Sequence, residues 1–388
     1  MAQPVRKVIK EEHPDLGKKV FYTLLIDGNN LLRLSFSDDK VNSRGVHYGA
    51  VFQFLLQVKL MLKKKMYDYI YVFFDDGDSG ILRYNIYNGY KANRGKKYGE
   101  HSNLSDYAKE LEATLSKWRN KYQTKEKKTS DSQKFVDENF ARERDMLMRY
   151  FDELYIRCVF DDITEGDDLI AYYVQHKDPD ERIVIMSTDE DLTQLISDTV
   201  CVYNKRLNKY ISIDNFKNIK GFPVENVVVK KVFLGDTSDN IKNIAGLSES
   251  KLFELVPEMK ERPVTIDEVK ERAKEKIDER VSEKKKPLKW HENIVNGVGN
   301  GEYDGDFYDI NKRLIDLTEP LITDTAKEMM DELMYAPQDP EGRSFENLYK
   351  LIQNDGIDEL SGERHFAAFF NEFRTFADKE IARYKAQA

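Results

Sequence analysis

The sequence predicts an α/β fold built on a mostly parallel, doubly wound sheet, with a long insertion and a helical C-terminal region. In the N-terminal half, short apolar runs of strand length alternate with segments of helical periodicity, which is the pattern of parallel βα units. A long polar and basic stretch interrupts this alternation. From about Pro223 to the C-terminus the apolar periodicity is helical alone.

The strands and helices of the sheet region can be placed in order from these patterns. Val, Ile, Tyr and Phe dominate the strand-like runs, as they do in buried strands. The segments between them place apolar residues at helical spacing. The expected strands are 20–26, 69–74, 155–160, 182–186, 200–203 and 210–213. The expected helices are 48–65, 140–154, one that opens at Thr164 and one that begins at Asp189.

Three segments carry no strand pattern. Residues 1–18 are polar and predict a flexible tail without the apolar core of a signal peptide. Residues 262–290 are highly charged, and the Gly and Asn residues of 291–306 predict a flexible loop. Helical patterns resume at Tyr308. The expected organisation is a tail over 1–18, a sheet domain over 19–235 and a helical region over 236–388.

The charge distribution bounds the class of partner. The net charge of −9 argues at first against nucleic acid. Basic residues nevertheless dominate from Arg83 to Lys128, and acidic residues gather in clusters elsewhere, which suits a protein that binds phosphate and metal ions. An acidic protein with one solvated basic loop has the same composition. Cys158 and Cys201 lie in apolar runs and are expected to be reduced, as in the cytoplasm, and no run approaches the ~18 residues of a membrane span.

Acidic residues follow the strand-like runs at four places, and a fifth acidic group lies at a helix–loop junction. The carboxyl ends of parallel strands form the ligand-binding crevice of such sheets, so the first four groups should converge. Packed carboxylates repel one another, and a bound cation relieves that repulsion. Oxygen ligands without His or Cys indicate Mg²⁺ or Mn²⁺, and their number fits two ions about 3.5–4 Å apart, as in phosphodiester hydrolysis. The candidate ligands are Asp27, Asp75, Glu165, Asp167, Asp168, Asp189, Asp191, Asp236 and Asp239.

Helix capping is the structural alternative for these groups. Thr164 with Asp167, and Thr188 with Asp191, resemble capping boxes, and acidic residues in a first turn also interact favourably with the helix dipole. For a single group, capping and metal binding are about equally favoured. Capping does not explain the aspartates that directly follow strand runs, nor five acidic groups in one chain. The whole set therefore favours a metal site.

The segments that carry these acidic residues, and several others, occur in an order that resembles the 5′-nuclease family. This family includes flap endonucleases and the 5′–3′ exonuclease domains of bacterial polymerases. Within the family the chain is most similar to the bacteriophage ribonuclease H branch of the T-even type. The matching segments are LLIDGNNLLR (24–33), VFFD (72–75), YKANRGK (90–96), EGDDLIA (165–171), STDEDLTQL (187–195), GDTSDNIKNI (235–244), NKRLIDL (311–317) and FFNEF (369–373). The resemblance therefore spans about residue 20 to residue 373.

The resemblance implies a role for each matched residue. The first metal ion would be bound by Asp27, Asp75, Glu165 and Asp167, the second by Asp189, Asp191, Asp236 and Asp239, with Asp168 between the two sites. Lys91 and Arg94 would contact the scissile phosphate as catalytic cations. The insertion at about 84–137 would form a helical arch over the ions, through which a 5′ strand passes. The expected fold is thus α/β, a mostly parallel doubly wound sheet with a long helical arch insertion and a helical C-terminal region.

The residue types of the basic segment also favour binding to nucleic acid, independently of the family resemblance. Cations can contact phosphates while an aromatic ring stacks on a base, whereas the alternative is a solvated loop. Connections beyond about 12–15 residues in a compact domain are mostly functional or disordered. We expect this segment to become ordered when substrate binds. The candidate nucleic-acid contacts are Arg83, Tyr90, Lys91, Arg94, Lys96 and Lys97.

The expected function is two-metal hydrolysis of RNA primers and DNA at 5′ ends or 5′ flaps during DNA replication. Expected partners are branched or 5′-ended DNA, RNA–DNA duplex, and replication proteins such as a single-strand-binding protein or a clamp. The protein is expected to be a monomer in the bacterial cytoplasm. The family's Gly-hydrophobic-Gly turn is replaced by Gly246-Leu247-Ser248, a degenerate helix-hairpin-helix that leaves a K⁺ site in doubt.

Two other functions compete with this hypothesis. A PIN-type endoribonuclease shares the acidic sheet, but such domains are short and lack the insertion and the helical C-terminal region. A non-catalytic module that binds branched DNA would have no need of the full acidic set. Cleavage of unstructured RNA would favour the first, and tight binding without metal-dependent cleavage would favour the second.

Overall fold

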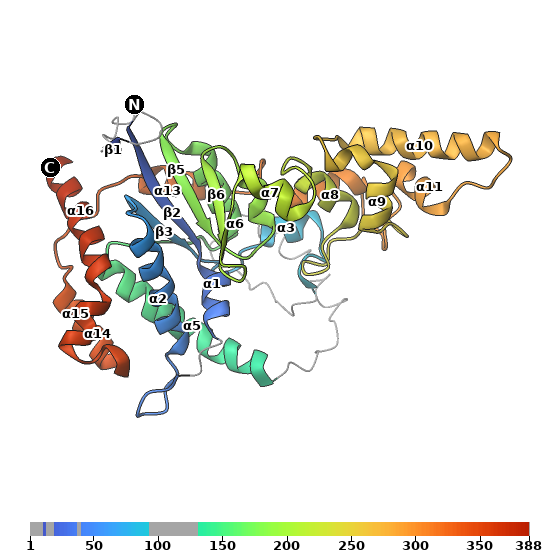
Figure 1. Ribbon diagram of the computed structural model, residues 1–388. Coiled ribbons are helices and arrows are strands. Elements are labelled where there is room, and N and C mark those ends of the chain that lie inside the picture. The colour runs from blue at the N-terminus through green and yellow to red at the C-terminus, as the bar shows by residue number, and fades with distance from the viewer. Residues whose placement is uncertain (1–10, 13–18, 37–39, 93–130, 388) are drawn as a thin grey trace.

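The computed structural model describes residues 11–12, 19–36, 40–92 and 131–387 (Figure 1). Most of the predicted tail and the central part of the predicted insertion, 93–130, lie outside these residues. Two residues of the tail, Glu11 and Glu12, form strand β1 and pair antiparallel with the start of β2. Within the described residues, no helix is both long and apolar enough to cross a membrane.

The described strands form one mixed sheet. Its main path runs β4-β3-β2-β5-β6-β7, and β1 pairs with β2 off this path. The four pairings from β4 to β6 are parallel, while β7 is antiparallel to β6. This confirms the predicted, mostly parallel sheet. The strands are β1 (Glu11–Glu12), β2 (Lys19–Asp27), β3 (Tyr69–Phe73), β4 (Arg157–Val159), β5 (Glu181–Met186), β6 (Val200–Asn204) and β7 (Lys209–Ile211).

Alternate side chains of the central strand β2 enter two different cores. Leu24 and Ile26 pack with α2 (Gly49–Lys64) and α5 (Asp131–Glu153), whereas Phe21 and Leu25 pack on the other side with α6 (Gly166–His176). A strand points successive side chains to opposite faces, so a strand covered on both faces reads as a continuous apolar run. The sheet is therefore doubly wound, as predicted.

The remaining helices cover the sheet, and some of them form a helical region that reaches beyond one end of it (Figure 1). The last three α-helices lie beside α2 and α5, and a third core joins the helices from α8 to α12. The elements are α1 (Gly28–Ser35), α3 (Ile81–Ile86), η2 (Asp191–Leu195), α7 (Ile213–Lys220), α8 (Asn226–Leu234), α9 (Glu249–Leu255), η3 (Pro257–Lys260), α10 (Ile266–Ser282), α11 (Lys289–Asn296), α12 (Phe307–Ile315), α13 (Asp324–Leu333), α14 (Phe345–Asp355), η4 (Asp358–Leu360), α15 (Glu363–Phe369) and α16 (Asn371–Gln387).

Two predicted elements were wrong. The segment predicted to be a flexible loop from residue 291 begins inside helix α11, because His291 and Ile294 are buried on its inner face. The helix continues to Asn296 and is capped by Gly297, which has a left-handed φ of 63°. The helix predicted to begin at Asp189 is a short 3₁₀ turn, η2, that starts at Asp191. The charged segment before α11 forms α10, and Figure 1 shows α10 and α11 extending away from the sheet as an arm.

Candidate active site

A polar pocket of about 620 Å³ lies where the carboxyl ends of β2, β3 and β5 meet. Several elements supply its walls, including the start of α1, the first turn of α6 and the loop that follows α8. This is the crevice in which open parallel sheets bind ligands. The predicted site residues that line it are Asp27, Asp75, Lys91, Asp167, Asp189, Asp191 and Asp239.

Asp27 is the last residue of β2 and the N-cap of α1. Its Oδ1 accepts a hydrogen bond from the Asn30 amide at 3.0 Å, and its Oδ2 accepts one from the Ser187 hydroxyl at 2.7 Å. The next residue must be glycine, because a Cβ on Gly28 would lie 2.6 Å from the Phe74 ring and 2.7 Å from the Phe73 carbonyl oxygen. The Asp-Gly pair at the junction of β2 and α1 therefore places a carboxylate at a tight turn.

Asp75 follows β3 and connects that strand to α6. Its Oδ1 accepts a hydrogen bond from the Gly166 amide at 2.8 Å, at the positive end of the helix dipole. Asp167 lies in the first turn of the same helix. The strand end and the helix start are thus held together, which brings both carboxylates to the pocket.

The capping alternative does not hold at the two threonines. The Thr164 hydroxyl oxygen accepts a long hydrogen bond from the Thr323 amide at 3.5 Å, and Thr188 donates its hydroxyl to Asn30 Oδ1 at 3.0 Å. The N-cap of α6 is Glu165, whose side chain makes no capping bond. Neither Thr164 nor Thr188 therefore closes a capping box.

Two aspartates of the pocket, Asp27 and Asp167, have raised pKa values. Burial raises the pKa of Asp27 to about 7, and the charges of Asp189 and Asp75 add to the effect, while hydrogen bonds from Asn30 and Ser187 oppose it. Burial also raises the pKa of Asp167 well above its usual value, and the charges of Asp27, Asp189 and Asp75 raise it further. These four aspartates therefore lie within electrostatic reach of one another, with charge that a cation would neutralise.

Glu165 is neutralised by basic residues of the chain. Lys91 Nζ contacts its Oε1, Arg83 Nη1 lies 2.6 Å from its Oε2, and the Tyr90 hydroxyl donates to Oε2 at 3.1 Å. Burial opposes ionisation of Glu165, but the cations of Lys91 and Arg83 outweigh it and lower its pKa to about 2. Glu165 does not line the pocket, although its partner Lys91 does.

Arg83 and Tyr90 were predicted to contact nucleic acid, and the structure contradicts both predictions. Arg83 is 5% exposed and Tyr90 3% exposed. Arg83 holds Glu165 and Asp168, with Nη2 lying 3.0 Å from Asp168 Oδ1, and donates from Nε to the Leu314 carbonyl. The Tyr90 ring belongs to the third core. A buried guanidinium must be paired, so Arg83 neutralises the buried carboxylates of Glu165 and Asp168.

Asp168 was expected between two metal ions, but the structure places it elsewhere. The side chain is fully buried, pairs with Arg83 and accepts a hydrogen bond from the Leu321 amide at 2.9 Å. It does not line the pocket. The neighbouring Asp167 does, because consecutive residues of a helix point in different directions.

A second acidic group lies where η2 meets the loop after α8. Asp236 Oδ1 accepts hydrogen bonds from the amide and the hydroxyl of Ser238, at 2.7 Å and 2.6 Å. Lys231 Nζ lies 2.8 Å from Asp236 Oδ2 and also contacts Asp191. Burial opposes ionisation of Asp236, but Lys231 outweighs it, so its pKa falls to about 2. Sequence analysis missed Lys231, because a lysine in the last turn of a helix is ordinary.

Asp239 connects the second acidic group to the base of the insertion. Its carboxylate accepts a hydrogen bond from the Tyr90 hydroxyl at 3.1 Å, and its carbonyl accepts one from the Lys91 amide at 2.9 Å. The Asn240 side chain donates to the Gly89 carbonyl at 2.6 Å. Lys91 is therefore fixed beside the acidic loop. The predicted contacts Arg94, Lys96 and Lys97 lie outside the described residues.

The donor chemistry of the pocket suits hard divalent cations. All its predicted ligands are carboxylates, which Mg²⁺ and Mn²⁺ prefer, and the repulsion among four of them is relieved by positive charge. Over the described part of the chain, no three His, Cys, Asp or Glu side chains stand together as a ready metal site. Ion binding therefore requires the aspartates to turn toward a shared ion or to reach it through water.

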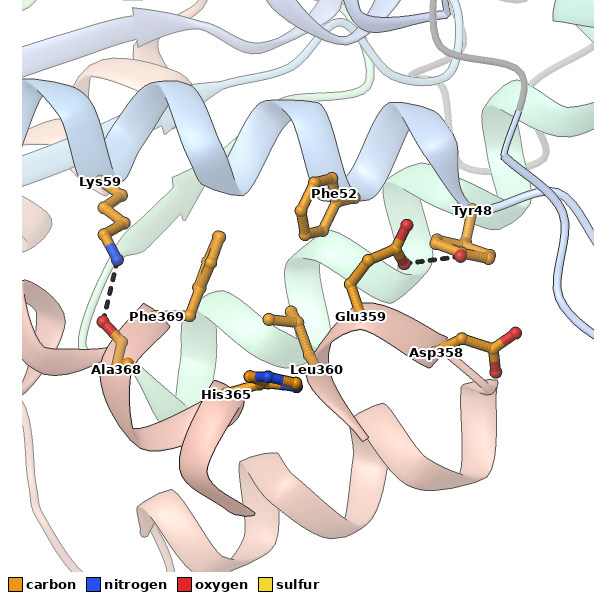
Figure 2. Close-up of a pocket in the computed structure, with 9 residues that line it drawn as sticks. All are labelled: Tyr48, Phe52, Lys59, Asp358, Glu359, Leu360, His365, Ala368 and Phe369. Atoms are coloured by element: carbon orange, nitrogen blue, oxygen red, sulfur yellow. Dashed lines mark hydrogen bonds between the residues drawn. The ribbon is translucent and has the colours of Figure 1, made fainter. Parts of the chain in front are cut away.

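A second hollow, of about 650 Å³, lies between α2 and the C-terminal helices. Figure 2 shows Phe52, Leu360 and Phe369 lining it, with Lys59 toward one end and Glu359 toward the other. None of the predicted site residues that the structure describes lines it. The acidic pocket at the sheet is therefore the candidate active site.

Fold and pocket together define an α/β protein with an acidic site at the carboxyl end of its sheet. Residues 22–221 match the family model described as the 5′-3′ exonuclease, N-terminal resolvase-like domain. The match covers more than half of the chain, so the chain belongs to this family. This confirms the resemblance to 5′-nucleases, while the closer similarity to the T-even branch stays a prediction.

Two curated relatives are similar over part of their length. The chain is 25% identical over 267 residues to DNA polymerase I of Bacillus subtilis, covering 67% of this chain and 26% of that protein. It is 27% identical over 237 residues to a 5′-3′ exonuclease of Mycoplasmopsis pulmonis, covering 60% of this chain and 65% of that protein. The chain thus spans about a quarter of the first relative and just under two thirds of the second.

Solved structures show the same fold at low identity. A bacteriophage T5 flap endonuclease in complex with DNA and metal ions aligns with a TM-score of 0.52 and 16% identity, covering 86% of this chain and 97% of that chain. The T5 5′-exonuclease with bound zinc aligns with a TM-score of 0.50 and 16% identity, covering 92% and 99%. These likenesses confirm the α/β fold.

Proposed function

We propose that the chain is a divalent-metal-dependent nuclease that hydrolyses phosphodiester bonds at 5′ ends or 5′ flaps. The observation that carries the proposal is the convergence of Asp27, Asp75, Asp167 and Asp189 on one pocket, where burial and then the neighbouring charges raise the pKa values of Asp27 and Asp167. Carboxylates held close together repel one another, which is costly unless they serve a site. Membership of the 5′-3′ exonuclease family supports the same reaction class.

Two Mg²⁺ or Mn²⁺ ions would supply an activated water and positive charge for the reacting phosphate. The first would be held by Asp27, Asp75 and Asp167, with Glu165 behind them, and the second by Asp189, Asp191, Asp236 and Asp239. The Asn30 amide and the Ser187 hydroxyl orient Asp27 for this role. Asp168 is left out of the set because Arg83 holds it outside the pocket.

Lys91 would position the scissile phosphate. Its side chain lines the pocket and is paired with Glu165, so a phosphate that enters must compete with that carboxylate for the ammonium. A cation beside the reacting phosphate fixes its orientation and stabilises charge that develops in the transition state. Arg94 is proposed for the same role on the family resemblance alone.

The proposed substrates are 5′-ended or branched DNA and RNA primers on DNA, processed during replication. The support is that the relatives are a DNA polymerase I and a 5′-3′ exonuclease. A ribonuclease H activity, and contact with a single-strand-binding protein or a clamp, belong to the same proposal. The helical region from residue 236 would grip the duplex part of the substrate.

The test uses 5′-labelled flap, nicked and RNA-primed duplexes, incubated with Mg²⁺ or with EDTA and sized by electrophoresis. We expect products released from the 5′ end or the flap junction in Mg²⁺ and none in EDTA. Full activity in EDTA, or equal degradation from 3′ ends, contradicts the proposal. Preference for unstructured RNA would favour a PIN-type endoribonuclease, and tight binding without cleavage would favour a non-catalytic module.

A further inference from the structure

The ammonium of Lys231 lies between two carboxylates from different parts of the chain. Its Nζ is 2.8 Å from Asp236 Oδ2, in the loop after α8, and contacts Asp191 Oδ1, at the start of η2. The three side chains are only 16–23% exposed. Ion pairs shielded in this way interact more strongly than solvated ones, because less water screens them. Lys231 is therefore a firm counter-ion of this acidic pair.

The Asp236 carboxylate is held in place while its cation can move. Ser238 binds Oδ1 of Asp236 with its amide and its hydroxyl. The backbone of Asp236 also exchanges two hydrogen bonds with Ile241, at 3.1 Å and 2.7 Å. Lys231, in contrast, carries its charge on a flexible four-carbon stem. The ammonium can therefore swing away while the acceptor stays in place.

In the other half of the pocket, no basic side chain that the structure describes is paired with Asp27 or Asp75 in this way. Asp27 accepts hydrogen bonds from the Asn30 amide and the Ser187 hydroxyl, and Asp75 accepts one from the Gly166 amide. These donors are neutral, and among the described residues neither carboxylate forms an ion pair. The two halves therefore differ. Lys91 lies beside the first half but its ammonium is paired with Glu165, whereas the ammonium of Lys231 is paired directly with Asp191 and Asp236 in the second half.

We propose that Lys231 is a built-in competitor of the second metal ion, and that an ion entering between Asp191 and Asp236 must displace its ammonium. The inference rests on the proposed function, because it requires the pocket to bind divalent ions. An ammonium and a divalent ion cannot share the same carboxylate oxygens without strong repulsion. The two ions therefore bind in order, the first tightly in the uncompensated half and the second weakly beside Lys231.

Direct metal binding tests this order without measuring activity. The full chain is titrated with Mn²⁺, and free Mn²⁺ is followed by electron paramagnetic resonance. We expect a tight and a weak class of site in the unsubstituted protein. K231M should tighten the weak class on the order of ten- to a hundredfold, the range over which groups around a metal site change affinity, and leave the tight class unchanged.

The next residue of the same helix provides a matched control. Lys230 pairs with Glu249 at 2.7 Å and does not contact the acidic pair, so K230M removes an equal charge and should leave both classes unchanged. K231R retains the charge and should keep the second class weak, which separates competition from a loss of local structure. A second class that is unchanged or weaker in K231M overturns the proposal. Absence of any Mn²⁺ binding in all variants overturns the proposed function as well.

Discussion

Asp167 lies in the first turn of α6, where an acidic side chain has two possible uses. As a capping or dipole residue, its loss would cost about 1 kcal/mol and leave turnover near normal. As a metal ligand amid like charges, its loss would relieve repulsion. We expect D167N to abolish cleavage while leaving the melting temperature in EDTA equal to or above that of the unsubstituted protein, because Asp167 is repelled by Asp27, Asp189 and Asp75.

The measurement is a single-turnover rate in Mg²⁺ and a thermal melt in EDTA on the same preparation. Binding of a 5′-flap duplex should persist in D167N, because the substitution removes negative charge that faces phosphate. Retained turnover with a lowered melting temperature would instead assign Asp167 to the helix alone.

The raised pKa of Asp27 gives the metal-free protein a specific pH dependence. Its pKa is raised from 3.8 to about 7, so the folded chain binds an extra proton between these values. The stability linked to that proton is fully present below pH 3.8 and is lost as the pH rises through about 7. In EDTA, the melting temperature of D27N should therefore fall less between pH 4.5 and pH 7.5 than that of the unsubstituted protein.

Glu165 and Asp236 shift in the opposite direction and do not disturb this comparison. Their pKa values are lowered from 4.5 and 3.8 to about 2, so their contribution is present above pH 4.5 and is lost as the pH falls from there through about 2. Saturating Mg²⁺ should flatten the curve of the unsubstituted protein toward that of D27N. Parallel curves for the two proteins in EDTA would rule out the raised pKa.

The residues that sequence reasoning placed well are those whose position follows from one strand end. Asp27 ends β2 and Asp75 lies two residues after β3, and the carboxyl ends of parallel strands meet. Arg83 and Lys231 could not be assigned in this way. Whether a basic side chain faces solvent or neutralises a buried carboxylate depends on contacts between distant segments, such as Arg83 with Asp168.

At the scale of elements, apolar periodicity predicted the strands better than composition predicted the helices. The run 69–74 reads as a buried strand because every residue of β3 is buried. The segment from His291 was read as a loop because Gly and Asn follow it closely. Its first turns are nevertheless helical, since Ile294 enters the third core, and tertiary burial overrides weak local propensity.

The arm formed by α10 and α11 carries a basic tip. Lys284, Lys285, Lys286 and Lys289 are exposed, and among the described residues Lys284 and Lys286 form no ion pair. Helix α10 has 17 residues and spans about 25 Å, a length of about seven base pairs. We expect the tip to contact duplex phosphates, so that K284S/K286S weakens binding of a long duplex arm and not of a short one.

The comparison uses substrates that differ only in duplex length, for example about eight and about twenty base pairs, measured by fluorescence anisotropy. Lys274 provides the control, because it is exposed on the same helix and forms no ion pair among the described residues. In K274S, the affinity for the long duplex should exceed that for the short duplex by as much as in the unsubstituted protein. Equal losses on both lengths would place the contact elsewhere.

On the scale of the whole molecule, the net charge of −9 opposes binding to a polyanion. The acidic pocket would add to that opposition at the place proposed for the scissile phosphate. Within the described part of the chain, no basic side chain forms an ion pair with Asp27 or Asp75, whose printed hydrogen-bond donors are neutral. Divalent ions in the pocket reverse the local sign. Affinity for nucleic acid should therefore depend on divalent ions in addition to its ordinary dependence on salt.

We expect a 5′-flap duplex to bind at least about tenfold more tightly in Ca²⁺ than in EDTA at equal ionic strength. The reason is that the few phosphates near the pocket are repelled by its carboxylates in EDTA and attracted by the bound ions in Ca²⁺. In both conditions, affinity should fall as monovalent salt rises, with a slope of about −0.7 per phosphate contacted on single strands. D167N should narrow the gap between Ca²⁺ and EDTA, because one source of repulsion and one ligand are lost together. Binding that is equally tight in EDTA and Ca²⁺ would mean that the scissile phosphate does not approach the acidic pocket, and would separate nucleic-acid binding from the candidate active site.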